Sequence, residues 1–549
     1  MCYTIFIERD LSTADGPPQE LSVTISAPLP GSPAAPPGPR RIRLGGITAL
    51  AQSAWMGFPL AADVLEPIRT APAALRRWTQ IIRPRRPSGG LRGLFNREFG
   101  IAEASFILMA SFFTSAALGA VRQVLFNAQF GVSAEANAYY AAFRLPDTLF
   151  SLVAGGALSS AMIPVLLSAR QKDGEAAAWR LVGLVLTALL AFMAAIIVVV
   201  GLFTPFFVEN LLAPGFDAAT SRLTVTLTRI MLAQPLVLAV GSVATAVLNS
   251  RNRFLPTALS VVSHNVALIA GIIASGLIPG LGILGPTLGV IGGALLQVLI
   301  LSPGLRERGG RISLAFNPRD TRLREVVRLL IPNGLSVGVN YSGFIVDTSF
   351  ATRAPQAAGL AALYNAFLLV GLPIALLGQA VGQAAFPRLT AHAEAGDWRQ
   401  LRRTQATALA AAVTLALGAV AGLLLLGRLV IRILFERGAF DAAAGDLTYR
   451  VLVVYAVALP AYIATEVITR GLIALRDTRT PLLTNSGQLI GRIVLIAVLL
   501  RPLGVVAIPA AFALTSTLET LTLGAVLWRK LARPGQDTPA AVLPNEATS

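Results

Sequence analysis

The sequence contains a single cysteine, Cys2, among its 549 residues, and only two histidines, His264 and His392. One thiol cannot form an internal disulfide or a thiolate metal cluster, and two isolated histidines give no support to a histidine-rich metal site. The sequence also lacks a Gly-x-x-x-x-Gly-Lys-Ser/Thr stretch, which is the usual phosphate-binding loop of nucleotide-driven proteins. We therefore expect no bound metal or cofactor, and no direct use of ATP through such a loop.

Charged residues are also scarce, at 13% of the chain, whereas hydrophobic residues make up 54% and the mean hydropathy is +0.68. A typical soluble domain has about 25% charged residues. The net charge of +17 comes from short basic clusters between apolar stretches, which is typical of the cytoplasmic loops of membrane proteins. This pattern favours a membrane protein and argues against nucleic-acid binding.

Apolar stretches long enough to cross a hydrocarbon core of about 30 Å recur from residue 101 to residue 528. The sequence thus predicts an all-α integral membrane protein of about twelve transmembrane helices. Several of the predicted spans exceed the roughly 20 residues that a crossing requires, so we expect them to be tilted, kinked or longer than the bilayer is thick. The predicted spans are 101–122, 135–166, 178–205, 220–248, 254–277, 281–303, 322–352, 357–390, 400–426, 446–473, 481–500 and 503–528.

Residues 1–97 differ in composition from the rest, because they are rich in proline, glycine and arginine. Such a composition predicts a largely disordered, basic extension. The acidic residues near its start do not fit a secretory signal peptide, and a start site assigned too far upstream would also explain the segment. After it we predict two six-helix domains, 98–310 and 311–530, and a short tail, 531–549.

The distribution of basic residues predicts the orientation, because lysine and arginine are retained in cytoplasmic loops. In the first half, basic loops alternate with the loops 123–134, 206–219 and 278–281, which contain no lysine or arginine. In the second half the contrast is weaker, since several arginines fall near the outer side. An even number of spans then places both termini in the cytoplasm.

The two halves of the chain resemble each other at an offset of about 223 to 225 residues. The segment from Tyr140 to Pro164 resembles the segment from Tyr364 to Pro387. Three further residues recur in the same order, 225 positions apart: Pro235 with Pro460, Arg251 with Arg476, and Pro256 with Pro481. Because each half would have six spans, the repeats should be parallel and should surround a central cavity that opens alternately to either side.

Several short motifs occur in the same order as in a known family of membrane proteins. They are Gly156 to Pro164, Ala213 to Phe216, Leu248 to Phe254, Leu434 to Asp441 and Arg476 to Pro481. In these motifs, and from about residue 100 to 530, the chain resembles the MurJ (MviN) family of lipid II flippases. The resemblance implies an exporter fold of the multidrug/oligosaccharidyl-lipid/polysaccharide type in a bacterial inner membrane. It also implies outward transport of an undecaprenyl-pyrophosphate-linked glycan, with cell-wall synthesis proteins as partners.

The resemblance to this family is incomplete at the charged positions of its cavity. Arg122, Arg144 and Asp347 match charged residues of the family. Five other sites carry residues unlike the family's charged ones: Ala116, Asn137, Phe150 with Ser151, Gly155, and Phe367 with Leu368. Many family members also have two further C-terminal spans. A different substrate, or a divergent paralogue, would explain these departures.

Helical spacing places Asn137, Tyr140, Arg144 and Ser151 on one face of the second span. We predict a polar stripe facing the cavity, in which Arg144 binds pyrophosphate with its two-pronged guanidinium. Alternatively, Arg144 only pairs with Asp147, one turn away.

In the seventh span, Asn340 and Asp347 form a similar stripe together with Asn333 and Ser336. An ionisable group at membrane depth normally faces a cavity or a partner. Asp347 is thus predicted to line the cavity, where it would exchange H⁺ or Na⁺ or pair with Arg122 or another buried cation. Arg122 is either a substrate ligand or an interfacial anchor. The predicted substrate-binding residues are Arg122, Asn137, Arg144, Ser151, Asn340 and Asp347.

Two pairs of residues stand at helical spacing, Glu466 with Arg470 in the tenth span and Gln488 with Arg492 in the eleventh. Glu466 and Arg470 are four residues apart, so they should neutralise each other on one helix. Arg492 is assigned to a lipid headgroup or a protein groove.

The composition leaves other classes of function open. They are a flippase for another polyprenyl-linked glycan, a small-molecule antiporter and a transport-dead scaffold. A membrane-embedded glycosyltransferase is disfavoured, because the early outer loop 123–134 has no acidic residue.

Overall fold

The computed structural model describes residues 95, 97, 99–153, 157–305, 315–356 and 358–532, which belong to one compact unit, Ser88–Ser549. These residues are almost entirely helical and contain no β-strand. The predicted extension and tail lie almost wholly outside the described residues, and the predicted boundary at 310 lies outside them too. The main helices are α4 (Ile101–Phe130), α5 (Ala134–Val153), α6 (Ala157–Leu202), α8 (Ala218–Met231), α9 (Ala233–Ser250), α10 (Phe254–Leu277), α11 (Leu284–Leu305), α12 (Thr321–Arg353), α13 (Gly359–Pro373), α14 (Ala380–Glu394), α15 (Trp398–Leu434), α16 (Ala442–Ala474), α17 (Arg479–Leu503) and α18 (Ala507–Ala532).

Aspartates begin several of these helices. Asp217, Asp320, Asp397 and Asp441 stand at the N-caps of α8, α12, α15 and α16, where each carboxylate accepts hydrogen bonds from first-turn N–H groups. An N-cap of this kind stabilises a helix by about 1 kcal/mol, because it satisfies N–H groups that have no partner in the helix. The hydroxyl and N–H of Thr220 also hold the pKa of Asp217 below its usual value.

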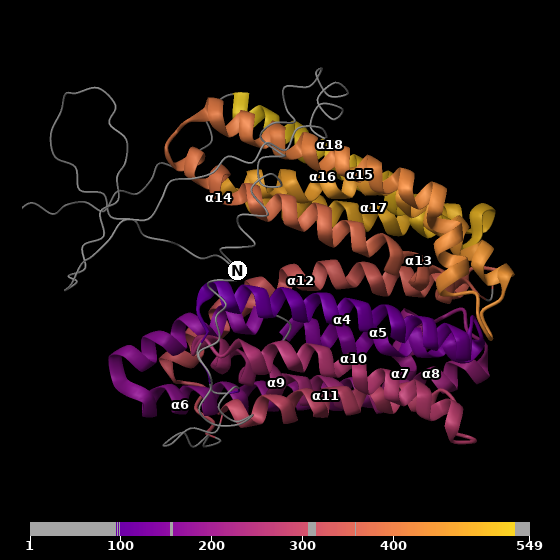
Figure 1. Cartoon of the computed structure of the whole chain (residues 1–549), viewed down its shortest axis with the longest axis horizontal. Helices are drawn as coiled ribbons and strands as arrows, with labels where there is room; N and C mark the ends of the chain where they lie inside the picture. Colours follow the sequence, from indigo (N-terminus) through magenta and orange to yellow (C-terminus); the bar gives the residue numbers. More distant parts are fainter. Residues whose placement is uncertain are drawn as a thin grey trace, which may run out of the picture. The chain divides into compact units, whose positions relative to one another are not determined.

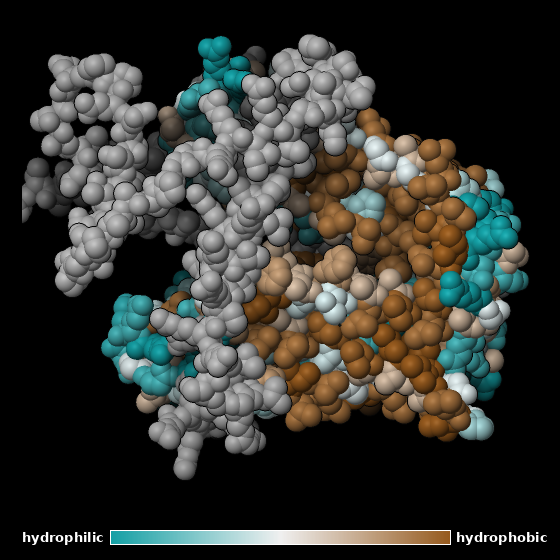
Figure 2. All heavy atoms as spheres, in the orientation of Figure 1, coloured by the Kyte–Doolittle hydropathy of each residue, from teal (hydrophilic) through white to brown (hydrophobic). Residues whose placement is uncertain are grey.

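The described helices present the apolar surface of a membrane protein. Nine helical stretches in this part of the chain are long and apolar enough to cross a bilayer. Hydrophobic residues cover the middle of the visible helical face, and hydrophilic residues gather toward its ends (Figure 2). The more polar α5 and α12 are not among the nine, although they occupy predicted spans. We conclude that the protein is a multi-pass membrane protein.

Several predicted spans are divided differently in the structure. The second and third predicted spans become α5 and a long α6, whose helical geometry is broken at Gly174, where φ is +83°. The fourth becomes two helices, α8 and α9, which meet at Leu232. The eighth becomes α13 and α14 with a π-helical segment, Ile374–Gln379, between them. The break at Gly174 lies in the predicted connection between residues 166 and 178, whereas apolar length alone does not reveal the breaks within the fourth and eighth spans.

The helices pack in two groups, with α12 between them (Figure 1). In the first group α10 and α11 pack together, as do α9 with α11 and α6 with α9. The same arrangement recurs in the second group as α17 with α18, α16 with α18 and α15 with α16. α12 packs on α5 and α6 of the first group and on α17 of the second. The predicted fold class of two repeated helical halves is therefore confirmed.

Local geometry also repeats at nearly the predicted offset. The N-cap residues Asp217 and Asp441 are 224 positions apart. Asn252 and Arg476 are also 224 apart, and they are the non-glycine residues with positive φ in the described part of the chain, at +56° and +61°. The shared turn conformation therefore makes Asn252 the counterpart of Arg476 in the repeat. The sequence comparison had aligned Arg476 with Arg251, one position earlier.

Two turns connect the halves at the end of the bundle that loop charge predicts to be outer. A Cβ on Gly215 would lie 2.1 Å from the carbonyl oxygen of Thr352, at the end of α12. A Cβ on Gly438 would lie 2.1 Å from the carbonyl oxygen of Ala128, near the end of α4. The Ala439 N–H donates to that same oxygen at 2.8 Å. Each turn packs on the first helix of the opposite half, and we call the two contacts the outer latches.

Replacing Gly438 by alanine should open the outer latches. The residue has φ +58° and its Cβ would contact backbone, so the substitution costs about 1–3 kcal/mol in the closed state from φ strain alone. We expect less disulfide cross-linking between Ala128→Cys and Ala439→Cys, measured in a Cys2→Ser background. Gly418→Ala is the matched control, because its Cβ would meet nothing within 4 Å. Unchanged cross-linking in Gly438→Ala would contradict the role of this contact.

Candidate functional site

Equivalent residues of the two halves meet at the interface between α5 and α13. The rings of Tyr140 and Tyr364, 224 positions apart, stack with their centroids 4.3 Å apart. Asn137 accepts a hydrogen bond at 3.0 Å from the backbone N–H of Ala361, its own equivalent in the repeat. Asn137 and Tyr140 are buried. Both were predicted to face a cavity. These contacts place them between the halves, where Tyr140 also lines a small cavity.

A network of buried amides lies beside these rings and also joins the halves. Asn127 on α4 and Asn365 on α13 are hydrogen bonded at 2.8 Å. The Gln123 amide lies 2.9 Å from the Asn365 oxygen and 2.7 Å from the Tyr140 hydroxyl. All four side chains are buried, so each polar group depends on the others for its hydrogen bonds.

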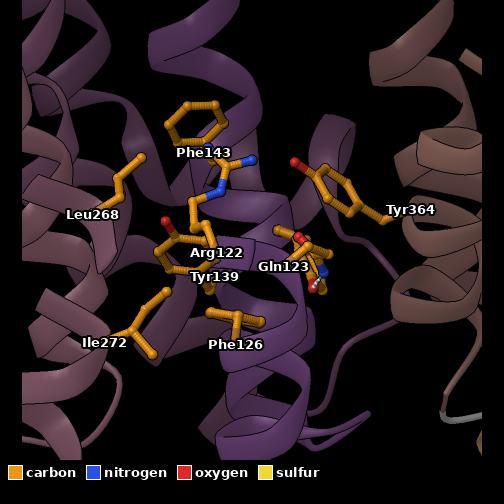
Figure 3. Close-up of a pocket in the computed structure, with 9 residues that line it drawn as sticks. Arg122, Gln123, Phe126, Tyr139, Phe143, Leu268, Ile272 and Tyr364 are labelled. Carbon is orange, nitrogen blue, oxygen red and sulfur yellow. Dashed lines mark hydrogen bonds between the residues drawn. The ribbon is translucent and has the colours of Figure 1, made fainter. Parts of the chain in front are cut away.

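Arg122 lines a small cavity of about 30 Å³ next to this network. Its guanidinium donates to Asn265 on α10 at 3.1 Å. The lining also includes Tyr139 and Phe143 of α5 and Tyr364 of the opposite half, whose hydroxyl points toward Arg122 (Figure 3). Arg122 therefore faces the interior of the bundle rather than acting only as an interfacial anchor.

Arg144 lies on the interface between the halves. Its Nε donates to Thr348 on α12 at 3.2 Å. Its guanidinium carbon is 5.2 Å from the ring centre of Phe344 and 5.5 Å from that of Tyr364, which are cation–π distances. The aromatic faces hold the guanidinium without neutralising its charge. Tyr364 thus lies against Arg144 and also lines the Arg122 cavity.

Asp347 forms an ion pair with Arg492 on α17, and both side chains are buried. This is the pairing with a buried cation that was one of the predicted alternatives, although the partner is Arg492 and not Arg122. The guanidinium carbon of Arg492 also lies 4.7 Å from the ring centre of Phe512. In this conformation Asp347 is therefore the counter-ion of Arg492.

Arg492 lines a second cavity, of about 100 Å³, within the second half. Its wall combines amide, hydroxyl, carboxylate and aromatic side chains. They come from α12, α13, α16, α17 and α18, and include Phe344, Tyr462, Asn485, Gln488, Phe512, Ser516 and Glu519.

The remaining predicted residues contribute less to this arrangement. Ser151 is buried and hydrogen bonds to Tyr341 on α12. Asn340 lies in α12, but its side chain is outside the described residues. Glu466 and Arg470 pair at 3.8 Å on one helix, as predicted. Within the described residues, no group of three or more His, Cys, Asp or Glu side chains could hold a metal ion.

Arg122, Arg144 and Arg492 thus follow one another across the interface, connected by Tyr364, Phe344 and Asp347. Guanidinium groups match the geometry of phosphate oxygens, and a partly dry setting strengthens that attraction. The sequence identified Arg122 and Arg144, but it did not reveal the amide network or the partner of Arg492. The chemistry of this arrangement suits an anionic group held between the two halves.

Comparison with known structures defines the class of protein. The fold is similar to an inward-facing multidrug resistance MATE family transporter of the MOP superfamily, with a TM-score of 0.67 at 14% identity, covering 76% of this chain and 94% of that one. It is also similar to the lipid II flippase MurJ in an inward closed conformation, with a TM-score of 0.65 at 23% identity, covering 77% and 87%. The fold is that of this exporter class.

Comparison of sequences defines the family. Residues 126–543 match the family described as lipid II flippase MurJ. The lipid II flippase MurJ of Burkholderia cenocepacia is 30% identical over 393 residues, which cover 70% of this chain and 76% of the relative. A protein named probable lipid II flippase MurJ from Rhizobium meliloti is 28% identical over 428 residues, covering 77% and 79%. The chain belongs to the lipid II flippase MurJ family, which is a family of transporters and not of catalytic enzymes. The predicted resemblance is confirmed.

The amide network should contribute to stability. Replacing Asn365 by leucine removes hydrogen bonds to Asn127 and Gln123 and leaves buried polar groups unsatisfied, which costs about 1–3 kcal/mol. We expect a lower thermal unfolding midpoint for the purified protein in detergent. Asn210→Leu, at an exposed asparagine, is the control and should leave the midpoint nearly unchanged. An Asn365→Leu protein as stable as the control would show that the network contributes nothing.

Proposed function

We propose that the protein moves lipid II, the undecaprenyl-pyrophosphate-linked precursor of peptidoglycan, from the inner to the outer leaflet of the bacterial inner membrane. The observation that carries this proposal is the row of arginines across the interface between the halves, in a chain of the lipid II flippase family. A pyrophosphate carries several negative oxygens, which are the natural partners of guanidinium groups. The polar headgroup would enter the bundle while the lipid tail stays in the bilayer.

The proposed mechanism is alternating access between two repeated six-helix halves, 98–310 and 311–530, with residues 1–97 and 531–549 as cytoplasmic ends. Loop charge supports an inner side at the basic loops and an outer side at the latches. Because the outer latches are closed in this conformation, the next step would be entry of the headgroup from the inner side. Opening of the latches would then release the headgroup outward.

A charged substrate crossing the membrane couples transport to the membrane potential, which is worth about 2.3 kcal/mol per charge per 100 mV. We include in the proposal a coupling ion, H⁺ or Na⁺, and contacts with cell-wall synthesis proteins, neither of which is assigned to particular residues.

A flippase for a different polyprenyl-linked glycan is the second candidate. It is favoured by uncharged residues where the family has charged ones, including Ala116, Phe150 and Phe367. Both candidates require recognition of a pyrophosphate, so the same arginines would serve either one. They differ in the sugar that the cavity accepts.

Depletion of the native lipid II flippase in a bacterium that expresses the full chain tests the proposal. We expect lipid II to appear on the outer leaflet, and we expect Arg144→Gln to reduce this appearance at least about tenfold, because a charge-assisted hydrogen bond is worth about 1.5–3 kcal/mol. The control is Arg222→Gln, at an exposed arginine of α8, which should flip lipid II normally.

Each outcome of this test has a distinct meaning. No rescue by a chain that is inserted in the membrane would contradict lipid II transport and would favour another glycan or a scaffold without transport. Rescue by Arg144→Gln at the wild-type level would show that the arginine row is not the substrate site.

A further inference from the structure

The ion pair between Asp347 and Arg492 is incompletely satisfied. Asp347 is 5% exposed and Arg492 is 7% exposed. The second carboxylate oxygen of Asp347, Oδ1, and the Nε of Arg492 are buried and have no hydrogen-bond partner among the described residues. A pair held only for stability would be expected to satisfy these groups as well, because an unpaired buried polar group costs free energy.

The pair lies directly beside the arginine of the opposite half. Phe344, one turn before Asp347 on α12, is in cation–π contact with Arg144 at 5.2 Å and also lines the cavity of Arg492. Asp347 itself lies within the electrostatic reach of both arginines. Arg144 comes from the first half and Arg492 from the second. A single anionic group at Asp347 could therefore contact both halves.

The carboxylate of Asp347 pairs with the guanidinium of Arg492, which could otherwise bind an external anion. Carboxylate and phosphate oxygens use the same two-pronged geometry on a guanidinium group, so they compete for it. An unpaired guanidinium at membrane depth costs several kcal/mol, so an empty transporter needs an internal counter-ion before it can close.

We propose that Arg492 is a further ligand for the pyrophosphate of the lipid-linked substrate, and that Asp347 is the internal counter-ion which the pyrophosphate displaces. This inference rests on the proposed function. In the empty protein Asp347 neutralises Arg492. When substrate enters, the pyrophosphate bridges Arg144 and Arg492 and pulls the two halves toward the same group. After release, Asp347 returns to Arg492 and allows the empty protein to close.

The first test measures binding of undecaprenyl pyrophosphate to the full-length protein in nanodiscs. Arg492→Gln should weaken binding at least about tenfold, because it removes a charged ligand. Asp347→Asn should do the opposite and tighten binding, because it removes the competing carboxylate. The same Asp347→Asn protein should flip lipid II more slowly than wild type, since the empty state has lost its counter-ion.

A double variant separates binding from folding. Arg492→Gln alone leaves a buried carboxylate, which could unfold the protein, whereas Asp347→Asn with Arg492→Gln leaves neither charge. The double variant should fold and still bind undecaprenyl pyrophosphate as weakly as Arg492→Gln. The matched control is Arg428→Gln, which breaks an ion pair with Glu436 in the same half and should bind normally.

The outcomes also separate this inference from the proposed function. If wild type flips lipid II while the double variant binds undecaprenyl pyrophosphate as wild type does, the pair is structural and the inference is wrong. Weaker binding by Asp347→Asn would also overturn it. If wild type flips no lipid II but binds undecaprenyl pyrophosphate through Arg492, the anion site stands and the proposed function falls.

Discussion

The cost of placing charge inside a membrane is the constraint on which the rest of the structure depends. Each of the three arginines has a partner inside the protein. Arg122 donates to an amide, Arg144 lies against aromatic rings and Arg492 pairs with Asp347. Only the last of these partners carries a full negative charge. Asp147, one turn from Arg144 on α5, lies within the electrostatic reach of that arginine. In the proposed function, an anionic headgroup would compensate the positive charge that remains at the interface between the halves.

The repeat explains why these groups meet at that interface. Tyr140 and Tyr364 are equivalent in the two halves, and their stacking marks the place where the repeated units face each other. The amide network beside them gives the interface hydrogen bonds, which would have to be exchanged in the proposed alternating-access cycle. At the outer end, the latches at Gly215 and Gly438 also join each half to the other, through close contacts with backbone. The duplication therefore accounts for the contacts at this interface and for the latches at one end of the bundle.

The sequence predicted the helical membrane fold and the repeat because the length of each apolar stretch and the constant offset between the halves can be read directly from it. It placed Asn137 on the correct helix face, but helical spacing cannot say whether that face meets a cavity or another helix. It identified Arg492 without its partner, because Asp347 is 145 positions away and only the packing of α12 against α17 brings them together. The break at Gly174 falls in the predicted connection between residues 166 and 178. The junction of α8 and α9 was not predicted, since it lies within one apolar stretch.

Transport of lipid II by the purified full-length chain in proteoliposomes tests the central claim most directly. Fluorescent lipid II on one leaflet should reach the other leaflet only when the protein is present, and undecaprenyl pyrophosphate should compete with it. A folded, correctly inserted protein that moves no lipid II, or moves it without competition from undecaprenyl pyrophosphate, would contradict the account of an arginine-lined pyrophosphate site.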